Sequence, residues 1–407
     1  MIKIGTDIAE IERFSEMKNL EAFVERIFTE REREYFASLK NPTESIAGSF
    51  AAKEAFSKYL GSGFRGFGFL DVEILRSEEG KPYICFRGRE VAADVSISHS
   101  KTNAIAVVCG EEFAAEEARL GLLKSYAKLL PQRYPDMNKG DCGKVFVIAG
   151  SVGMVGAACL CARATMRSGS GLVTLGVPQC VQPQAAVKLD EVMTMPLPCR
   201  DGELCTDATE QIMEKVKKCD VCAVGPGLGR SDDIKEILKA LLNQNTPLVI
   251  DADGLNAIAH DMSVLKEKNC SVVITPHPGE MARLTGLSIE EVEQDREGVA
   301  KKFAKEYDAV VVLKGHRTVI ASPDEEVHIN ESGNSGMASG GMGDVLTGVI
   351  ASLVGQGKEV YDAAVLGVFV HGLAGDMVAE DIGEFGLVAG DVAEKLPFAI
   401  KELTGVI

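Results

Sequence analysis

The sequence lacks an excess of positive charge: 43 Lys and Arg residues stand against 60 Asp and Glu residues, for a formal net charge of −17. A protein that binds nucleic acid normally presents a basic face, so this balance argues against a nucleic-acid partner. The first residues lack the basic and hydrophobic regions of a secretory signal. The uncharged run of residues 145–162 is interrupted by glycines, which indicates strand, turn and helix and no membrane span. We therefore expect a cytoplasmic protein without a membrane partner.

The spacing of a zinc site is also missing, although the chain has 11 cysteines. Cys219 and Cys222 form one isolated CxxC motif, with no second pair and no histidine close by. Thiols of a cytosolic protein normally stay reduced. We therefore expect buried free cysteines.

Length and pattern indicate two domains of different class. A chain of 407 residues is too long for one ordinary core. Residues 1–112 mix strand-like and helical segments, which predicts an α+β domain. Residues 113–130 have the composition and spacing of a helix and end at Pro131, so we predict a connecting helix. From residue 131 to residue 407 short apolar strands alternate with helices, which predicts an α/β domain with a mostly parallel central sheet.

The most informative stretch of the second domain is a glycine-rich loop, residues 333–344, with the sequence GNSGMASGGMGD. Closely spaced glycines let successive backbone N–H groups point at one site. The apolar run of residues 345–354 has helical spacing, so these N–H groups would lie at a helix N-terminus, where an anion is favoured. Asp344 stands at the junction, where its carboxylate can face the same anion; the alternative is an N-cap aspartate after a flexible loop.

Other polar loops directly follow predicted strands of the same domain. The predicted strands are residues 145–149, 172–176, 221–224, 248–251, 272–275 and 310–313. The loops after the last four are residues 225–229, 251–256, 275–280 and 314–318. Ligands of parallel sheets bind at the carboxyl ends of the strands, so the loops together predict a nucleotide-phosphate cleft.

Residues 130–407 resemble the ADP- or ATP-dependent NAD(P)H-hydrate dehydratases, which have the ribokinase-like fold. The resemblance lies in the loops above, in KGD at residues 139–141, in HGLAGD at residues 371–376 and in GDV at residues 390–392. It implies repair of hydrated NADH and NADPH: a nucleotide phosphorylates the hydroxyl of the hydrate, and phosphate then leaves as the ring double bond returns. Asn138 and Met342 depart from the family's usual residues.

The resemblance also implies roles for individual residues. Asp344 would deprotonate the attacking hydroxyl, and the N–H groups of Gly340–Gly343 would stabilise the transferring phosphoryl group. The implied contacts of the AMP part of the nucleotide are Lys314, Gly315, His316, Arg317, Thr318 and Gly343. The implied contacts of the hydrated nucleotide are His277, Gly227 and Ala157. A histidine bonded to its neighbours and a solvated lysine are the alternatives for His277 and Lys314.

In the first domain, Asp7 lies at the end of a predicted strand and Glu54 lies on a predicted helix. The two carboxylates could share one Mg²⁺ ion if the strand end meets the helix. Lys58 is four residues from Glu54 and shares its helix face, so a simple helix-stabilising pair is the alternative. His99 ends another predicted strand and could reach the same place.

Residues 1–110 resemble holo-acyl-carrier-protein synthase, the phosphopantetheinyl transferase of fatty acid synthesis. The resemblance lies in residues 5–13, 25–29, 50–58, 80–82 and 98–100. It implies transfer of phosphopantetheine from coenzyme A to a serine of acyl carrier protein, with Asp7 and Glu54 binding Mg²⁺ and with Lys58 and His99 on the phosphate side. Arg13 and Arg26 would face the carrier protein. Members of this family form trimers with sites between subunits, so we expect a homo-oligomer.

The sequence thus predicts a bifunctional enzyme, a phosphopantetheinyl transferase fused to a dehydratase of (6S)-NAD(P)H-hydrate. The region before residue 130 matches the transferase pattern, so we expect no epimerase domain there. Two alternatives stay open. The second domain could be a kinase for a small vitamin alcohol, or the first domain could be a catalytically silent oligomerisation module.

Overall fold

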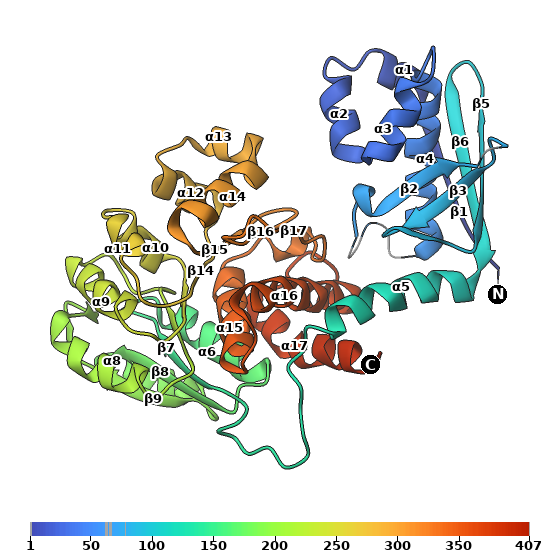
Figure 1. The fold of residues 1–407 in the computed structure, drawn as a ribbon. Helices are drawn as coiled ribbons and strands as arrows, with labels where there is room; N and C mark the ends of the chain where they lie inside the picture. Colours follow the sequence, from blue (N-terminus) through green and yellow to red (C-terminus); the bar gives the residue numbers. More distant parts are fainter. Residues whose placement is uncertain (1, 62–63, 65–66, 78, 407) are drawn as a thin grey trace. The chain divides into compact units, whose positions relative to one another are not determined.

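The computed structural model describes residues 2–61, 64, 67–77 and 79–406. The chain divides into two compact units, one up to Ser125 and one spanning Tyr126–Gly405 (Figure 1). The division falls inside helix α5 (Glu112–Ala127), in the segment predicted to be a connecting helix. This helix ends three residues before the predicted end at residue 130. The domain limits 1–112, 113–130 and 131–407 stay a prediction.

The N-terminal unit has the predicted α+β composition. One antiparallel sheet has the strand order β1-β6-β5, and its long helix α4 packs across it. Its strands and helices are β1 (Ile2–Glu10), α1 (Ile11–Ser15), α2 (Leu20–Ile27), α3 (Glu30–Ala37), α4 (Thr43–Leu60), β5 (Ala93–His99) and β6 (Asn103–Glu111). A second antiparallel sheet consists of β2 (Val72–Arg76), β3 (Pro82–Phe86) and β4 (Arg89–Glu90).

Helix α4 approaches strand β1 closely at Gly5. A Cβ atom on Gly5 would lie 2.0 Å from the carbonyl oxygen of Ala55 and 2.4 Å from the backbone nitrogen of Tyr59. No side chain fits in that space, so glycine is required here for the close approach of the two backbones. The contact fixes which residues of the helix face the strand, and it places the middle of β1 beside the last turns of α4. Because β1 continues to Glu10, the prediction that Asp7 ends this strand is wrong.

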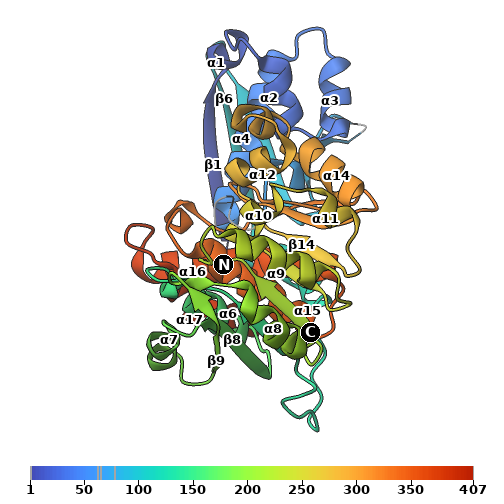
Figure 2. The same cartoon turned by 90° about the vertical axis from the view of Figure 1, so that its left-hand side faces the viewer.

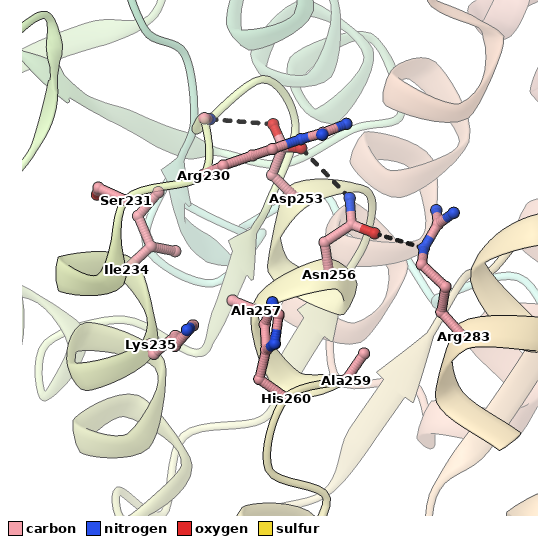
Figure 3. A pocket seen from close by; sticks show the side chains of 11 residues that line it. Arg230, Ser231, Ile234, Lys235, Asp253, Asn256, Ala257, Ala259, His260 and Arg283 are labelled. Carbon is pink, nitrogen blue, oxygen red and sulfur yellow. Dashed lines mark hydrogen bonds between the residues drawn. The ribbon is translucent and has the colours of Figure 1, made fainter. Parts of the chain in front are cut away.

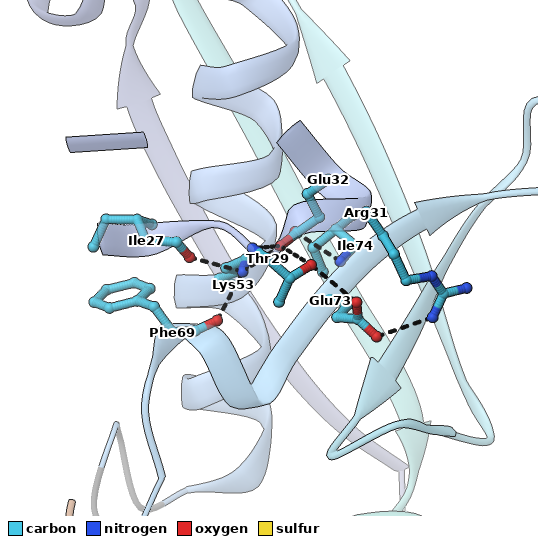
Figure 4. Close-up of polar contacts among 8 residues, drawn as sticks. All are labelled: Ile27, Thr29, Arg31, Glu32, Lys53, Phe69, Glu73 and Ile74. Atoms are coloured by element: carbon cyan, nitrogen blue, oxygen red, sulfur yellow. Dashed lines mark hydrogen bonds and ion pairs between the residues drawn. The ribbon is translucent and has the colours of Figure 1, made fainter. Parts of the chain in front are cut away.

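A buried lysine is at the centre of the polar contacts in this unit (Figure 4). The Nζ atom of Lys53, on α4, donates to Glu32 Oε2 at 2.7 Å and to the carbonyl oxygens of Ile27 and Phe69 at 2.9 and 2.7 Å. Glu32 also accepts a bond from the Ile74 backbone N–H at 3.0 Å. Burial lowers the pKa of Lys53, and the charge of Glu32 opposes that effect. The pair ties α3, α4 and β2 together.

The C-terminal unit is built on a nine-stranded sheet with the order β17-β16-β15-β14-β13-β12-β7-β8-β9. The seven strands from β15 to β9 are parallel, and β16 and β17 continue the sheet in antiparallel pairing. The nine strands are β7 (Lys144–Ile148), β8 (Leu172–Pro178), β9 (Met193–Leu197), β12 (Val221–Val224), β13 (Leu248–Ile250), β14 (Val272–Ile274), β15 (Val310–Leu313), β16 (Val319–Ala321) and β17 (Val327–Ile329). The predicted fold class, with its mostly parallel sheet, is confirmed.

Helices cover both faces of this sheet (Figure 1 and Figure 2). Apolar side chains on one face form a core with α8 (Thr209–Val216), α9 (Asp232–Leu242), α10 (Asp253–Ile258), α11 (Ser263–Lys266), α12 (Pro278–Thr285), α13 (Ile289–Gln294) and α14 (Arg296–Tyr307). The other face packs on α6 (Val155–Arg167), α15 (Met342–Gly355) and α16 (Val360–Ile382), and α17 (Ala389–Thr404) packs on these three helices. The remaining elements are α7 (Gln182–Lys188) and a short ribbon of β10 (Cys199–Arg200) and β11 (Glu203–Leu204).

Helix α16 is long and apolar enough to cross a membrane by length and composition. Within this unit, however, 83% of its most apolar window is buried, as in the core helix of a folded domain.

All 11 cysteines are free thiols. Seven are buried, as the sequence predicts, but Cys180 is exposed and three others are half-buried, so the expectation of buried thiols is wrong for these four.

Replacing Lys53 with Met should destabilise the N-terminal unit by about 3–5 kcal/mol, because Glu32 would remain buried without its cation. Unfolding of the full chain in urea, followed by circular dichroism, measures the change. Lys81→Met is the matched control, since Lys81 pairs with Asp94 at 3.2 Å but both side chains are exposed. A similar loss in the two variants would contradict a special role for the buried pair.

Candidate active site

The carboxyl ends of three parallel strands meet the start of α15 at a buried ion pair. Lys314, just after β15, places its Nζ atom 2.6 Å from Oδ1 of Asp251, just after β13. The Thr347 hydroxyl, on α15, donates to the other oxygen of Asp251 at 2.9 Å. Asp251 is 1% exposed, so both of its oxygens are satisfied within the protein. Glu280 Oε2 lies 3.9 Å from the same ammonium group.

The charges around Lys314 determine its protonation. Burial lowers the pKa of Lys314, but the carboxylates of Asp251, Glu280 and Asp344 outweigh burial, and the pKa is raised overall. The ammonium group therefore keeps its charge beside the glycine-rich loop. A Cβ atom on Gly343 would lie 3.1 Å from Lys314 Nζ, which shows how close the loop backbone comes to the cation.

Asp344 lies in the first turn of α15, because the helix begins at Met342 and not at residue 345 as predicted. Gly341 is the N-cap and has φ +93°, a left-handed conformation that favours glycine. Burial raises the pKa of Asp344 to about 7, with further repulsion from Asp251 and Asp253 and a partial offset from Lys314. A carboxyl with this pKa can take up and release a proton at neutral pH, as a general base requires.

Helix α16 holds the glycine-rich loop through hydrogen bonds to Asp376. Asp376 accepts bonds from the Gly333 backbone N–H and from Asn334 Nδ2, both at 2.9 Å. His371, one and a half turns earlier, is buried; burial and the charge of Lys314 lower its pKa to about 4, although a backbone hydrogen bond with Met342 opposes the shift. The imidazole is therefore neutral where it contacts the start of α15.

The predicted nucleotide contacts divide into two places. Lys314 is partly buried, with 19% of its side chain exposed, and residues 315–318 form a turn between β15 and β16. In this turn Gly315 and His316 are exposed, and Arg317 and Thr318 are half-buried. The Thr318 hydroxyl donates to the carbonyl oxygen of Gly315 at 3.0 Å, and Arg317 pairs with Glu331 at 2.8 Å. His316 accepts a bond from Arg296 through its carbonyl oxygen, so its imidazole is left at the surface.

The predicted contacts of the hydrated nucleotide also occupy strand ends. His277 is the N-cap of α12, where its Nδ1 atom accepts bonds from the N–H groups of Gly279 and Glu280 at 3.0 and 3.3 Å. Its side chain is 52% exposed, so one ring edge stays accessible. Gly227 lies against Ala157, since a Cβ on Gly227 would be 3.2 Å from the Ala157 Cβ.

A turn at Ala252 separates two carboxylates. Ala252 has φ +48° and ψ −118°, a conformation that residues with a side chain rarely adopt. Asp251, before it, faces Lys314. Asp253, after it, accepts a bond from the Gly229 backbone N–H at 3.0 Å and contacts Asn256 at 3.4 Å (Figure 3).

Asp251, Thr347 and Glu280 belong to this site, although they are not among the site residues predicted from the sequence. Asp251 had a usable signal, because it ends a predicted strand at the edge where ligands bind. Thr347 lies one turn beyond Asp344 on a helix of the predicted apolar run, and Glu280 belongs to a loop that was noted only as a whole. Their roles depend on the tertiary meeting of β13, β15, α12 and α15.

In the N-terminal unit the structure brings Asp7, Glu54 and Lys58 together. Lys58 Nζ lies 2.8 Å from Asp7 Oδ1 and 3.1 Å from the Thr6 carbonyl oxygen. Burial and the negative charge of Asp7 raise the pKa of Glu54, with a partial offset from Lys58. Two mutually repelling carboxylates fit a magnesium ion, which binds one or two carboxylates and keeps water or phosphate ligands. No group of three or more metal-binding side chains occurs in the described part of the chain.

The structure does not bring His99 to these residues within one chain. Its Nδ1 atom lies 3.7 Å from Oε2 of Glu44, at the opposite end of α4 from Glu54 and Lys58. Ten residues of helix separate Glu44 from Glu54, which is about 15 Å along the axis.

Two protein families match the two parts of this chain. Residues 145–397 match the profile described as NAD(P)H-hydrate dehydratase. Residues 3–114 match the profile of the 4′-phosphopantetheinyl transferase superfamily. Together the matches span most of the sequence, and they confirm the pair of families predicted from the motifs.

Individual relatives match the C-terminal part. The chain is 46% identical over 276 residues, 67% of its length, to the bifunctional NAD(P)H-hydrate repair enzyme of Moorella thermoacetica, of which it covers 52%. The ADP-dependent (S)-NAD(P)H-hydrate dehydratase of Neisseria meningitidis is 37% identical over 286 residues, with 68% of this chain and 92% of that relative covered. The chain spans about half the length of the curated bifunctional repair enzymes that it matches.

A solved structure is similar in fold as well. The ADP/ATP-dependent NAD(P)H-hydrate dehydratase of Bacillus subtilis, co-crystallised with ATP/Mg²⁺, has a TM-score of 0.61 and 29% sequence identity. The match covers 69% of this chain and 97% of that one.

Asp344 should make the stability of the C-terminal unit depend on pH. Its pKa is about 7 when folded against 3.8 as an unperturbed group, so the stabilisation is complete below pH 3.8 and is lost as the pH rises through 7. Between pH 5 and pH 8 the free energy of unfolding should fall by about 2–3 kcal/mol more than in Asp344→Asn. Urea unfolding at the two pH values measures this difference.

The exposed Asp324 provides the control for that measurement. Asp324→Asn should keep the pH dependence of the unchanged chain. An Asp344→Asn variant with the same pH dependence would contradict the raised pKa.

Proposed function

The chain belongs to the NAD(P)H-hydrate dehydratase family, and on that premise we propose that residues 131–407 convert (6S)-NAD(P)H-hydrate to NAD(P)H at the expense of ADP or ATP. The observation that carries the proposal is the position of Asp344, a carboxyl with a pKa of about 7 in the first turn of α15. This carboxyl shares the carboxyl edge of the sheet with the cation of Lys314 and the backbone N–H groups of the helix start. A base, a cation and an anion cradle are the parts that phosphoryl transfer needs.

In the proposed reaction, Asp344 takes the proton of the hydrate's hydroxyl group. The oxygen attacks the terminal phosphorus of the nucleotide, and the bond from that phosphorus to the leaving nucleotide breaks. Phosphate then leaves the ring carbon with its bonding electrons, a ring proton is lost, and the double bond returns. Phosphate is a far better leaving group than hydroxide, which explains why a nucleotide is consumed.

Each neighbouring residue would support one part of this reaction. The N–H groups of Gly340–Gly343 would stabilise charge on the transferring phosphoryl group. Lys314, held by Asp251, would contact the AMP part of the nucleotide together with Gly343. Gly315, His316, Arg317 and Thr318 would contact the AMP part of the nucleotide. Gly227, Ala157 and His277 would contact the hydrate.

We further propose that residues 1–112 transfer phosphopantetheine from coenzyme A to a serine of acyl carrier protein. The match to the transferase superfamily and the Asp7–Glu54–Lys58 cluster support this reaction. Asp7 and Glu54 would hold Mg²⁺, which would neutralise charge on the pyrophosphate of coenzyme A when bound. Residues 113–130 would connect this domain to the dehydratase, and we place both in the cytoplasm.

The proposed transferase would act as a homo-oligomer, in the form of a trimer. Ile2, Ile4 and Ile8 are 69%, 62% and 62% exposed and alternate along one face of β1. Ile105 pairs with Ile8 in register and is also exposed. An apolar sheet face of this kind is typical of an interface between copies. A second copy could also bring His99 to the Asp7–Glu54 cluster, which one chain does not do.

Asp344→Ala should reduce nucleotide-dependent dehydration of NADPH-hydrate at least ~100-fold, the scale for removal of a positioned base. Recovery of absorbance at 340 nm and release of inorganic phosphate measure the reaction. Asp324→Ala, which removes an exposed carboxyl, should retain full activity. A stable phosphorylated vitamin alcohol as the product of the unchanged chain, with no dehydration, would favour the small-alcohol kinase instead.

Ile4→Asp should prevent assembly and abolish transfer of phosphopantetheine, because a charge on the apolar face of β1 cannot be buried between copies. Sedimentation gives the oligomeric state, and an assay with coenzyme A, Mg²⁺ and apo acyl carrier protein gives the activity. Glu54→Gln should remain assembled but lose transfer. Assembly of the unchanged chain with no transfer in the presence of Mg²⁺ would leave only an oligomerisation role for this domain.

A further inference from the structure

A cavity in the C-terminal unit is lined by residues that the proposed reaction does not use (Figure 3). Its volume is about 360 Å³, within the range of about 300–1,000 Å³ that small-molecule sites occupy. Arg230, Lys235, His260 and Arg283 line it, together with the apolar side chains of Ile234 and Ala257. We refer to this cavity as the basic pocket.

Three chain segments that line the basic pocket also carry or adjoin residues of the proposed hydrate site. Arg230 belongs to the loop that contains Gly227. Asp253, in the pocket lining, is separated from Asp251 only by the strained Ala252, and its charge contributes to the raised pKa of Asp344. Arg283 is on α12, the helix that His277 caps.

The charges of the pocket are not neutralised internally. In the described ranges of the chain, no carboxylate contacts the guanidinium of Arg230. Arg283 donates through Nε to Asn256 Oδ1 at 3.0 Å, which leaves its two terminal nitrogens available. Asp253 is the carboxylate of the lining, and it already accepts bonds from Gly229 and Asn256.

Lys235 adds a further positive charge at the edge of the pocket. It pairs with Asp232 at 2.6 Å, but the Asp232 side chain is 92% exposed, so solvent screens the pair. Two arginines without a carboxylate partner among the described residues thus line the pocket, together with a lysine whose partner Asp232 is exposed and with one carboxylate, Asp253, that is already hydrogen-bonded. An arrangement of arginines around an unfilled space is typical of a phosphate site.

We propose that the basic pocket binds the adenosine end of the hydrated dinucleotide and that Arg230 and Arg283 contact its 2′-phosphate. The inference rests on the proposed dehydratase function and adds a preference for NADPH-hydrate over NADH-hydrate. Ile234 and Ala257 give the adenine ring an apolar wall, and the cations lie where the extra phosphate requires them. The reactive nicotinamide end then extends toward Gly227 and Asp344.

The kinetic test uses Arg230→Ala in the full chain. Its KM for NADPH-hydrate should rise roughly 10-fold or more, the scale of a lost bond to a charged phosphate, while its KM for NADH-hydrate should change less than about 2-fold. Turnover at saturating substrate should be unchanged for both. Arg230→Lys should retain part of the preference, and Arg89→Ala, which removes an exposed arginine of the N-terminal unit, should leave both KM values unchanged.

A binding measurement separates the pocket from the reaction. With ADP present to fill the nucleotide site, adenosine 2′,5′-bisphosphate should bind the unchanged chain at least ~10-fold more tightly than adenosine 5′-phosphate in calorimetry, and Arg230→Ala/Arg283→Ala should lose that difference. If the unchanged chain prefers the bisphosphate but does not dehydrate NAD(P)H-hydrate, the proposed function is wrong and the phosphate-binding role of the basic pocket still holds. If the chain dehydrates the hydrate but binds the two adenosine phosphates equally well, the proposed role of the basic pocket is wrong. Equal changes in KM for the two hydrates in Arg230→Ala would also contradict that role.

Discussion

The buried contact between Lys314 and Asp251 is the constraint on which the C-terminal site depends. A buried charge pair is stable only where the remaining hydrogen bonds of both groups are made, and Thr347 supplies the second bond to Asp251. These three side chains come from β13, β15 and α15, so the pair fixes how the start of the helix lies over the sheet edge. That position in turn determines the electrostatic environment of Asp344. Burial is the main cause of the raised pKa of Asp344, and the opposing charges of Asp251 and Lys314 modify it.

On the proposed functions, the two units would bind phosphate by opposite electrostatic means. In the N-terminal unit, the charge of Asp7 raises the pKa of Glu54, and a divalent cation would relieve that repulsion. In the C-terminal unit, a lysine, a helix N-terminus and a neutral His371 surround the place of the proposed transfer. In the proposed functions, a bound metal would supply positive charge to the first site, whereas Lys314 and the helix N-terminus would supply it to the second.

Much of this arrangement could be predicted because the signals are local. The parallel strands appear as short apolar runs, and the anion cradle appears as closely spaced glycines before an apolar helix. The exact start of α15 at Met342 could not be predicted, because Gly341 adopts a left-handed conformation that sequence spacing does not reveal. Glu280 and Thr347 were missed since only tertiary packing brings them to Lys314. His99 was expected near Glu54, but antiparallel pairing of β5 with β6 places it beside the first turn of α4 instead.

The strained turn at Ala252 has a consequence for how the two ends of a long substrate communicate. One residue separates Asp251, which holds Lys314, from Asp253, which lines the basic pocket, and the charge of Asp253 contributes to the raised pKa of Asp344. If an anion binds beside Asp253 as proposed, it would alter the proton equilibrium of Asp344, and by thermodynamic reciprocity the ionisation of Asp344 would alter the affinity for that anion. The turn at Ala252 would thus keep the substrate-binding carboxylate and the carboxylate beside the catalytic residue close together, so that binding and proton transfer are coupled.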